Sequence, residues 1–198
     1  MIKIPKRIIY SNYYWIIANS TTEVFSSASA SFVPVTDPTY VKYLADNIGH
    51  VVPSVPDNDT LIKILTVEAP AISLWNLYSV QQAQALQTAI LAAEYDLAII
   101  APVEYTSVAG TTAIFSQDAK AKENLQNAIT GATPSGIWDL DLWLDVNNVV
   151  IKPFTFADLE GLAAAMKAHD IPEYKHLLDK ISLVHAANTI PAIKAIAW

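Results

Sequence analysis

The stretch with the densest set of reactive side chains is residues 138–148, which reads WDLDLWLDVNN. Its carboxylates, at positions 139, 141 and 145, raise the question of a calcium loop or an acidic catalytic cluster. A calcium loop needs oxygen ligands at its first, third and fifth positions, glycine at the sixth and a carboxylate at the twelfth. Counted from Asp139, the fifth residue is Trp143 and the twelfth is Val150. Counted from Asp145, the fifth residue is again apolar, so neither register fits.

Strict alternation explains this stretch better than metal binding. Leucines and Trp138 occupy the even positions from 138 to 144, while the acids and Trp143 occupy the odd ones. Such alternation is typical of a half-buried strand. The following DVNN predicts a turn, and VVIKPF predicts the return strand. We therefore expect a β-hairpin with Trp143 on its outer, acidic face, where this residue would mark a contact surface.

Other reactive residue types also lack the spacing that chemistry requires. The chain has no cysteine, and its four histidines form no HExxH motif or close pair. There is no GxSxG sequence, and the five glycines form neither GxGxxG nor a phosphate-binding loop. The sequence thus predicts no catalytic residue, no cofactor and no metal site, and we expect a protein that is not an enzyme.

Composition narrows the possible partners. Of the 198 residues, 53% are hydrophobic and 16% are charged, and the net charge is −7. An acidic chain with scattered lysines and arginines gives no electrostatic footprint for nucleic acid. No apolar run is long enough for a transmembrane helix, and the start lacks a signal peptide, so we expect a soluble protein without a membrane partner. The apolar excess favours burial against another protein or another copy.

The N-terminal part is predicted to be rich in β-structure. Residues 8–35 contain three short β-branched and aromatic runs, which we interpret as an antiparallel meander. Short helices are expected after a cap at Thr36 or Asp37 and after a cap at Asp57 or Asp59. The aromatic residues Tyr13 and Trp15 are interface candidates on this sheet. We assign residues 1–68 to an N-terminal β-rich docking module and residues 69–198 to a C-terminal α+β domain.

A long helix is predicted to open the C-terminal domain. Ser79 and Gln82 form a capping box, and Pro102 ends the helix. Its apolar residues are spaced 3, 4, 3, 4, 3, in a seam made of Ala83, Leu86, Ile90, Ala93, Leu97 and Ile100. The seam could pack on the domain's own core or could mediate self-association. Leu86, Ile90 and Leu97 are therefore further interface candidates.

The rest of the chain alternates hairpins and helices. Residues 103–115 predict a β-hairpin that turns at Ala109–Gly110, and residues 116–131 predict a helix. The hairpin at 138–154 is followed by a helix that Thr155 caps together with Asp158 and that runs to about 169. A second helix is expected from Asp170 to about 187, and a short helical turn follows it. The expected fold class is α+β, with an N-terminal antiparallel β-meander and short helices, followed by C-terminal helices with two β-hairpins.

Two blocks of the sequence resemble known families. STTEVFSSASASFVPVTDPTYVKYLADN, at residues 20–47, resembles the N-terminal module of many small phage tail proteins. The C-terminal half resembles DUF4376, a domain found in tail-fibre-associated proteins. That resemblance rests on the alanine-rich helix from residue 79, on YTSVAGTTAIF, and on WLDVNNVVIKPFTFADLEGLAAAMKAH with the final IKAIAW.

The resemblance implies a non-enzymatic structural component of a phage tail, associated with the fibre or baseplate. It would be made in the cytoplasm of the host bacterium, would reside in the virion tail, and would bind itself or other tail proteins. An alternative is a tail-fibre assembly chaperone that the mature virion does not retain. A third class, a receptor-binding or carbohydrate-active tip, would require aromatic side chains lining one groove, whereas the sequence spreads them along the chain. Host-surface contact has no support of its own in the sequence.

Overall fold

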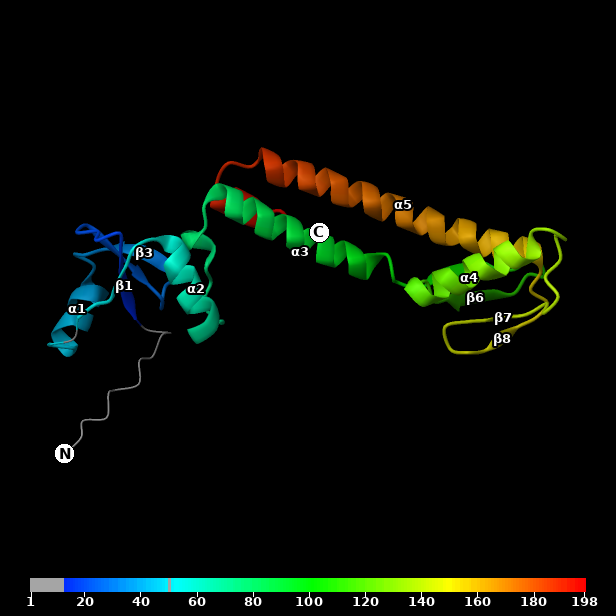
Figure 1. Ribbon diagram of the computed structural model, residues 1–198, viewed down its shortest axis with the longest axis horizontal. Coiled ribbons are helices and arrows are strands. Elements are labelled where there is room, and N and C mark those ends of the chain that lie inside the picture. The colour runs from blue at the N-terminus through cyan, green and yellow to red at the C-terminus, as the bar shows by residue number, and fades with distance from the viewer. Residues whose placement is uncertain (1–12, 50) are drawn as a thin grey trace, which may run out of the picture. The chain divides into compact units, whose positions relative to one another are not determined.

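The structure is a computed structural model that describes residues 13–49 and 51–198 (Figure 1). The chain forms two compact units. Residues up to 85, together with 188–194, make the first unit, and residues 86–187, together with 195–198, make the second. Mixed helices and strands in both units confirm the predicted α+β class.

A small sheet forms the centre of the first unit. Strands β1 (Tyr14–Ile17), β2 (Glu23–Ser26) and β3 (Ser31–Pro34) pair antiparallel, as the meander prediction expects. The segment predicted at 8–12 lies outside the described residues. A two-residue strand, β4 (Ser54–Val55), pairs in parallel with β1, which gives the order β3-β2-β1-β4.

Helices with side-chain caps pack beside this sheet. Helix α1 (Pro38–Asp46) begins after Asp37, whose carboxylate accepts hydrogen bonds from the backbone N–H groups of Thr39 and Tyr40. Helix α2 (Asn58–Glu68) is capped in the same way by Asp57. The 3₁₀ turn η2 (Trp75–Leu77) and the short helix α6 (Ile190–Lys194) complete the unit. The larger core cluster consists of Trp15, Ile17, Phe25, Val55, Leu61, Leu65 and Leu77.

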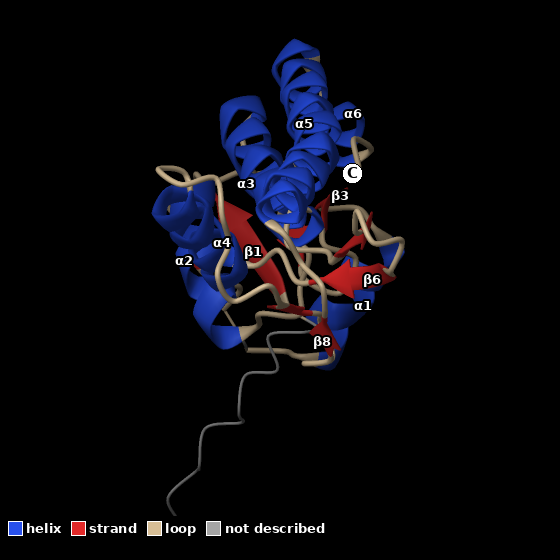
Figure 2. Ribbon diagram, turned by 90° about the vertical axis from the view of Figure 1, so that its right-hand side faces the viewer, coloured by secondary structure: helices blue, strands red, loops and turns tan. Residues whose placement is uncertain are grey.

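Two long helices run side by side in the second unit. Helix α3 (Val80–Ala98) lies along α5 (Phe156–Ala186) from Leu86 onward (Figures 1 and 2). The predicted capping box of α3 is present, because Ser79 and Gln82 exchange backbone-to-side-chain hydrogen bonds of 2.8 and 3.2 Å. The end of the chain contacts both helices, since the Trp198 ring lies 4.8 Å from His176 and 6.3 Å from Tyr95.

The prediction of two helices after Thr155 is wrong, because α5 is one helix of 31 residues with Pro172 inside it. A proline within a helix removes one backbone hydrogen bond and costs about 3 kcal/mol. Packing on both sides of the proline outweighs that cost, since Leu162 and Met166 are buried before it and Leu177 and Val184 after it. The predicted capping box of Thr155 with Asp158 is confirmed.

Two small hairpins and helix α4 complete the second unit. Strands β5 (Val103–Thr106) and β6 (Thr112–Phe115) form the predicted hairpin, with Gly110 at a φ of +85° in its turn. Helix α4 (Ala119–Ala132) follows. The second hairpin is shorter than predicted, because only β7 (Trp143–Leu144) and β8 (Val150–Ile151) are strands. Residues 138–142 are not a strand but contain a turn at 139–140, which a hydrogen bond of 3.2 Å from the Asp141 N–H to the Trp138 carbonyl closes. The Trp138 indole N–H also donates to the Leu142 carbonyl.

The core of the second unit is built where α4, α5 and the hairpins meet. Its buried members are Val103, Phe115, Leu125, Ala128, Ile151, Phe154, Leu159, Leu162 and Met166. Residues from both hairpins and both helices thus share one apolar cluster, and this cluster fixes the side chains of the site described next.

Candidate functional site

Trp143 lies on the core side of the second hairpin. Residues that pair directly across an antiparallel ladder share a face, and the pairs here are Trp143 with Ile151 and Leu144 with Val150. Ile151 is buried, whereas Leu144 and Val150 are exposed. The prediction that Trp143 faces outward among the acids is therefore wrong. The reason is the loss of strand geometry before residue 143, which removes the alternation on which that prediction rested.

The Trp143 ring is held by two aromatic neighbours. It stacks on Phe154 with ring centroids 6.2 Å apart and planes 23° from parallel. Trp138 lies 6.1 Å away at 58°. Both tryptophans are half-buried and pack against the core of the second unit. Offset and tilted aromatic pairs add to the stability gained from area burial alone, so the ring is fixed in place.

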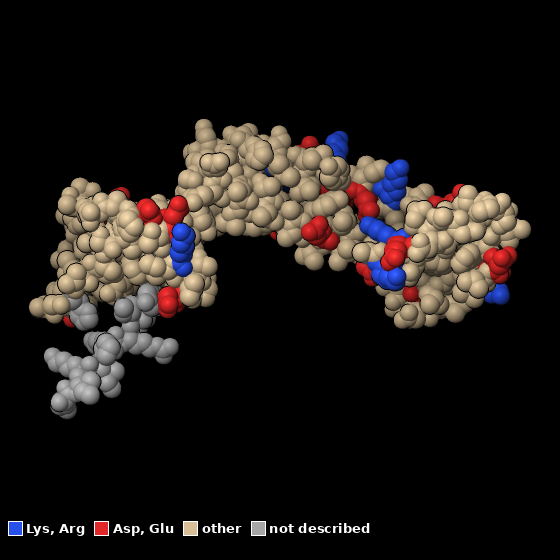
Figure 3. Space-filling view, in the orientation of Figure 1, with Lys and Arg blue, Asp and Glu red and all other residues tan. Residues whose placement is uncertain are grey.

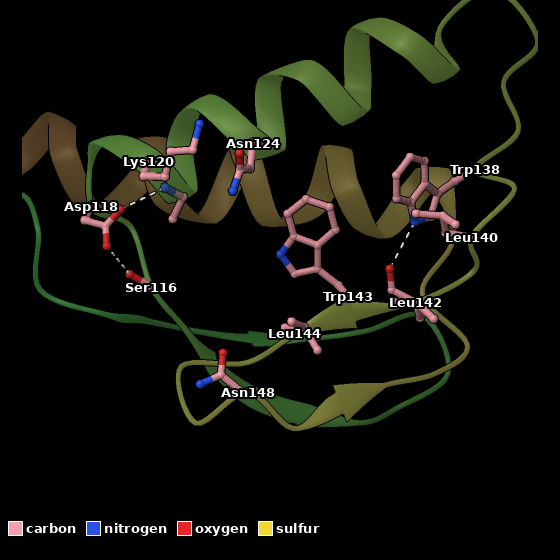
Figure 4. Close-up of a pocket in the computed structure, with 11 residues that line it drawn as sticks. Ser116, Asp118, Lys120, Asn124, Trp138, Leu140, Leu142, Trp143, Leu144 and Asn148 are labelled. Carbon is pink, nitrogen blue, oxygen red and sulfur yellow. Dashed lines mark hydrogen bonds between the residues drawn. The ribbon is translucent and has the colours of Figure 1, made fainter.

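A pocket of about 510 Å³ opens beside Trp143 (Figure 4). It lies between α4, the turns before β7, and the second hairpin. Its lining combines indole rings and leucines with hydroxyl, amide and charged groups, contributed by Ser116, Asp118, Lys120, Ala121, Asn124, Trp138, Leu140, Leu142, Trp143, Leu144 and Asn148. The structure thus brings together two tryptophans that are five residues apart in the sequence.

Several polar groups of the pocket already have partners. The Asp118 carboxylate accepts hydrogen bonds from the Ala121 N–H (2.8 Å) and the Ser116 hydroxyl (3.1 Å) as the cap of α4. These two bonds hold the pKa of Asp118 below its ordinary value, so the group is ionised at neutral pH. Lys120 forms an ion pair of 2.9 Å with Glu123.

Other polar groups of the pocket have no partner among the described residues and are open to solvent or to a ligand. The side-chain amides of Asn124 and Asn148 and the indole N–H of Trp143 make no hydrogen bond to the part of the chain that the structure describes. Figure 4 shows Asn124 projecting from α4 toward the Trp143 ring. The pocket can therefore offer one flat aromatic surface together with amide donors and acceptors.

Only the start of the predicted seam of α3 lies on the face on which this helix packs, since Ala83 is buried and the seam residues from Ile90 onward are exposed. The buried residues are Ala83, Gln87 and Leu91, which repeat every four residues. Within the seam, Leu86 is half-buried, but Ile90, Leu97 and Ile100 are 37%, 68% and 45% exposed. The helix thus has one face in its own fold and a second, heptad-spaced apolar face in solvent.

A second exposed apolar region lies on the hairpins. We call it the hairpin surface, and it consists of Ile114, Leu144, Val146, Val149 and Val150, all exposed. Two of its members, Leu144 and Val150, are cross-strand partners. The Val146 N–H donates to the Ile114 carbonyl across 2.8 Å, which joins the second hairpin to β6. The region therefore lies on two neighbouring hairpins.

The aromatic candidates of the N-terminal sheet lie mostly inward. Trp15 is buried in the core cluster of the first unit, and Tyr13 is half-buried against the same cluster. Their rings meet edge to face at 5.6 Å. Both therefore contribute to the packing of the first unit.

Neither a metal site nor a membrane-spanning helix is found among the described residues. Among residues 13–49 and 51–198, no three His, Asp or Glu side chains come close enough to hold a metal ion. Within the same described residues, no helix combines the length and the apolar character needed to cross a membrane.

Comparison with known families matches residues 82–196 to the family described as Domain of unknown function (DUF4376). This match covers more than half of the chain. The chain belongs to the DUF4376 family. No curated protein and no solved structure matches the chain. The DUF4376 region begins inside α3 and includes the whole seam, the pocket and the hairpin surface.

Several pocket residues of the DUF4376 region carry no signal in the sequence. Asn124 occupies an exposed helix position, and Ser116 and Asp118 look like ordinary capping residues. Trp138 was expected on the inner face of the hairpin, apart from Trp143. One signal in the sequence could have suggested the pocket: two tryptophans lie five residues apart, with two leucines between them.

Proposed function

We propose that the protein is a non-enzymatic structural component of a phage tail, associated with the fibre or baseplate and acting by protein–protein assembly. The resemblance of residues 20–47 to the N-terminal module of phage tail proteins supports the setting. Membership of the DUF4376 family supports the fold of the C-terminal half and assigns it no reaction.

The observation that carries the assembly role is the exposed seam of α3. Leu97, 68% exposed, continues the same heptad spacing as Leu86 and Ile90, and Ile100, 45% exposed, follows in the turn after the helix. Burying apolar surface is worth about 25 cal/mol per Å². A helix that already has a buried face gains nothing in its own fold from a second apolar stripe. Such a stripe is what one helix offers another across an interface.

The hairpin surface adds a second place for association in the same unit. Five exposed branched apolar side chains lie on a hairpin and its neighbouring strand. On the face drawn in Figure 3, charged side chains lie in several separate groups, one of them near α3, α4 and α5, with wide uncharged areas between them. Only 16% of the residues are charged, so few charged groups are present to disfavour the burial of these apolar surfaces by a partner.

Quantitative mass spectrometry of purified virions tests this proposal. A structural component is expected at a fixed copy number relative to the tail proteins, and it should remain after washing in high salt. Absence from mature particles, with presence in infected-cell lysates, would overturn the structural role. That outcome would instead fit the alternative of an assembly chaperone, which needs the same exposed apolar surfaces but leaves before the tail is complete.

A further inference from the structure

We propose that the pocket beside Trp143 binds a neutral saccharide. This is a binding function in addition to assembly, and it does not depend on the protein being a tail component. The inference rests on three features of the pocket: a fixed aromatic surface, exposed amides beside it that bond to no other described residue, and charged groups that already have partners.

The aromatic surface is rigid before any ligand arrives. One face of the Trp143 ring stacks on Phe154, and Trp138 packs at 6.1 Å. The ring also lines the pocket (Figure 4). A sugar ring presents a face of C–H groups that packs well on an indole, and a platform held in place loses little conformational entropy when it binds.

Hydrogen-bonding groups without partners lie around this platform. The amides of Asn124 and Asn148 each offer donors and an acceptor, and neither bonds to another group among the described residues. Sugar hydroxyls both donate and accept, so a side-chain amide suits two neighbouring hydroxyls better than a carboxylate or an ammonium group does. A purely apolar ligand would leave these amides without partners and would bind less well.

The charges of the pocket favour a neutral ligand. Asp118 is a helix cap that accepts from Ala121 and Ser116, and Lys120 is paired with Glu123 at 2.9 Å. One anion and one cation, both engaged, give no net attraction for a phosphate, a sulfate or an acidic sugar. The net charge of −7 further disfavours anionic ligands.

The size of the pocket is also suitable. Ligand sites in proteins usually enclose about 300–1,000 Å³, and this pocket encloses about 510 Å³. The space is larger than one hexose needs, so a short oligosaccharide is expected to bind more tightly than its monomer.

The experiment titrates the full-length protein with glucose, galactose, mannose and N-acetylglucosamine, and with their dimers to tetramers. Binding is followed by tryptophan fluorescence and by calorimetry. A saturable response is expected with at least one oligomer series at micromolar to millimolar concentration. No saturable response from any member of the panel would overturn the proposal.

Variants locate the binding at this pocket. Asn124→Ala and Asn148→Gly each remove one amide that is open to a ligand, and each is expected to weaken binding about three- to tenfold. Glycine is chosen at 148 because Asn148 has a φ of 62°, which alanine would adopt only with strain. Asn127→Ala is the matched control, since Asn127 is exposed on the same helix but does not line the pocket.

Equal affinities in all three asparagine variants would place the sugar elsewhere and would overturn the assignment. Trp143→Phe is expected to bind more weakly and to lose most of the fluorescence change. The asparagine variants keep the test decisive even if the Trp143 variant folds poorly, because both amides lie at the surface.

Discussion

The phenol of Tyr105 on β5 donates a hydrogen bond of 3.2 Å to the carboxylate of Asp158 at the start of α5. Asp158 is fully buried and also accepts from the Val108 N–H at 2.6 Å and from the N–H and hydroxyl of Thr155 at 2.7 Å. One carboxylate therefore joins the first hairpin of the second unit to the helix that the hairpin packs against. A buried charge with several donors is well stabilised only while it stays ionised.

Stability should fall in acid because of this carboxylate. Burial raises the pKa of Asp158, but hydrogen bonds from Thr155, Val108 and Tyr105 outweigh burial and leave the pKa below its ordinary value. A lowered folded-state pKa contributes stability that is fully present above the unfolded value of about 3.9. This contribution is lost as the pH falls through the lower, folded-state pKa. Urea unfolding at pH 7, 5, 4 and 3 should show little change down to pH 5 and a decline below about pH 4.

Asp158→Asn should separate this contribution from that of other acids. The NH₂ group of asparagine cannot accept hydrogen bonds, so it would face buried donors that the carboxylate satisfies. We therefore expect a loss of about 2–4 kcal/mol in the free energy of unfolding at pH 7. The variant should also show a smaller decline in acid than the wild type. Asp139→Asn is the control, because Asp139 is exposed and should change stability by less than about 0.5 kcal/mol. Equal acid profiles for wild type and Asp158→Asn would contradict the assignment.

Gly161 makes room for the Tyr105 ring on α5. A Cβ built at Gly161 would come within 2.8 Å of the Tyr105 ring carbon Cζ and closer still to the hydroxyl oxygen. The ring cannot move aside without losing Asp158 or its contacts with Phe115 and Phe154, at 6.3 and 6.2 Å. Gly161→Ala is therefore expected to destabilise the protein by about 1–3 kcal/mol in thermal or urea unfolding.

Gly131→Ala is the same substitution as Gly161→Ala but is expected to have the opposite effect on stability. Gly131 lies inside α4, and a Cβ there would meet no atom within 4 Å. Alanine should therefore stabilise the helix by about 0.5–1 kcal/mol. If Gly161→Ala proved as stable as Gly131→Ala, the close packing of Tyr105 on α5 would be refuted.

Local signals in the sequence predicted much of the fold. The caps Asp37, Asp57 and Thr155 and the glycine turn at Gly110 act within a few residues of the chain, so their geometry follows from the sequence. The prediction at Pro172 was wrong because the local cost of a proline in a helix is outweighed here by tertiary packing, and a short stretch of sequence does not reveal that packing. The same limit explains β4, whose two residues are a strand only because β1 lies beside them.

The site was harder to predict than the elements that hold it. The heptad spacing of α3 is visible in the sequence, but the face on which the helix packs is not. One of the residues on that face is Gln87, a polar residue in a position where an apolar one is usual. Its amide donates to the Ile196 carbonyl across 2.6 Å, so a contact over more than a hundred residues makes this polar position compatible with burial. Likewise, Trp143 faces the core because residues 138–142 turn rather than extend.

Lys122 should matter more to stability than its neighbour Lys120. Its ammonium group donates to Asp170 at 2.8 Å and to the Ile99 carbonyl at 3.1 Å, which links α4 to α5 and to the end of α3. Both charged side chains of this pair are 31% exposed, whereas Lys120 and Glu123 are 72% and 60% exposed. We expect Lys122→Met to cost about 1–2 kcal/mol and Lys120→Met less than about 0.5 kcal/mol. Chemical denaturation of the two variants side by side measures the difference, and equal losses would contradict it.

Leu97 should govern association without affecting the fold. Its side chain is 68% exposed near the C-terminal end of α3. A charge there costs little in the isolated protein but must be desolvated in any interface that covers it. We expect the wild type to form oligomers in light scattering at micromolar concentration, and Leu97→Glu to shift the mass toward the monomer with its thermal unfolding midpoint within about 2 °C. Ala85→Glu is the control, because Ala85 is exposed on the same helix outside the seam. The seam would have no part in assembly if the wild type stayed monomeric and the Leu97→Glu variant bound purified tail proteins as well as the wild type does.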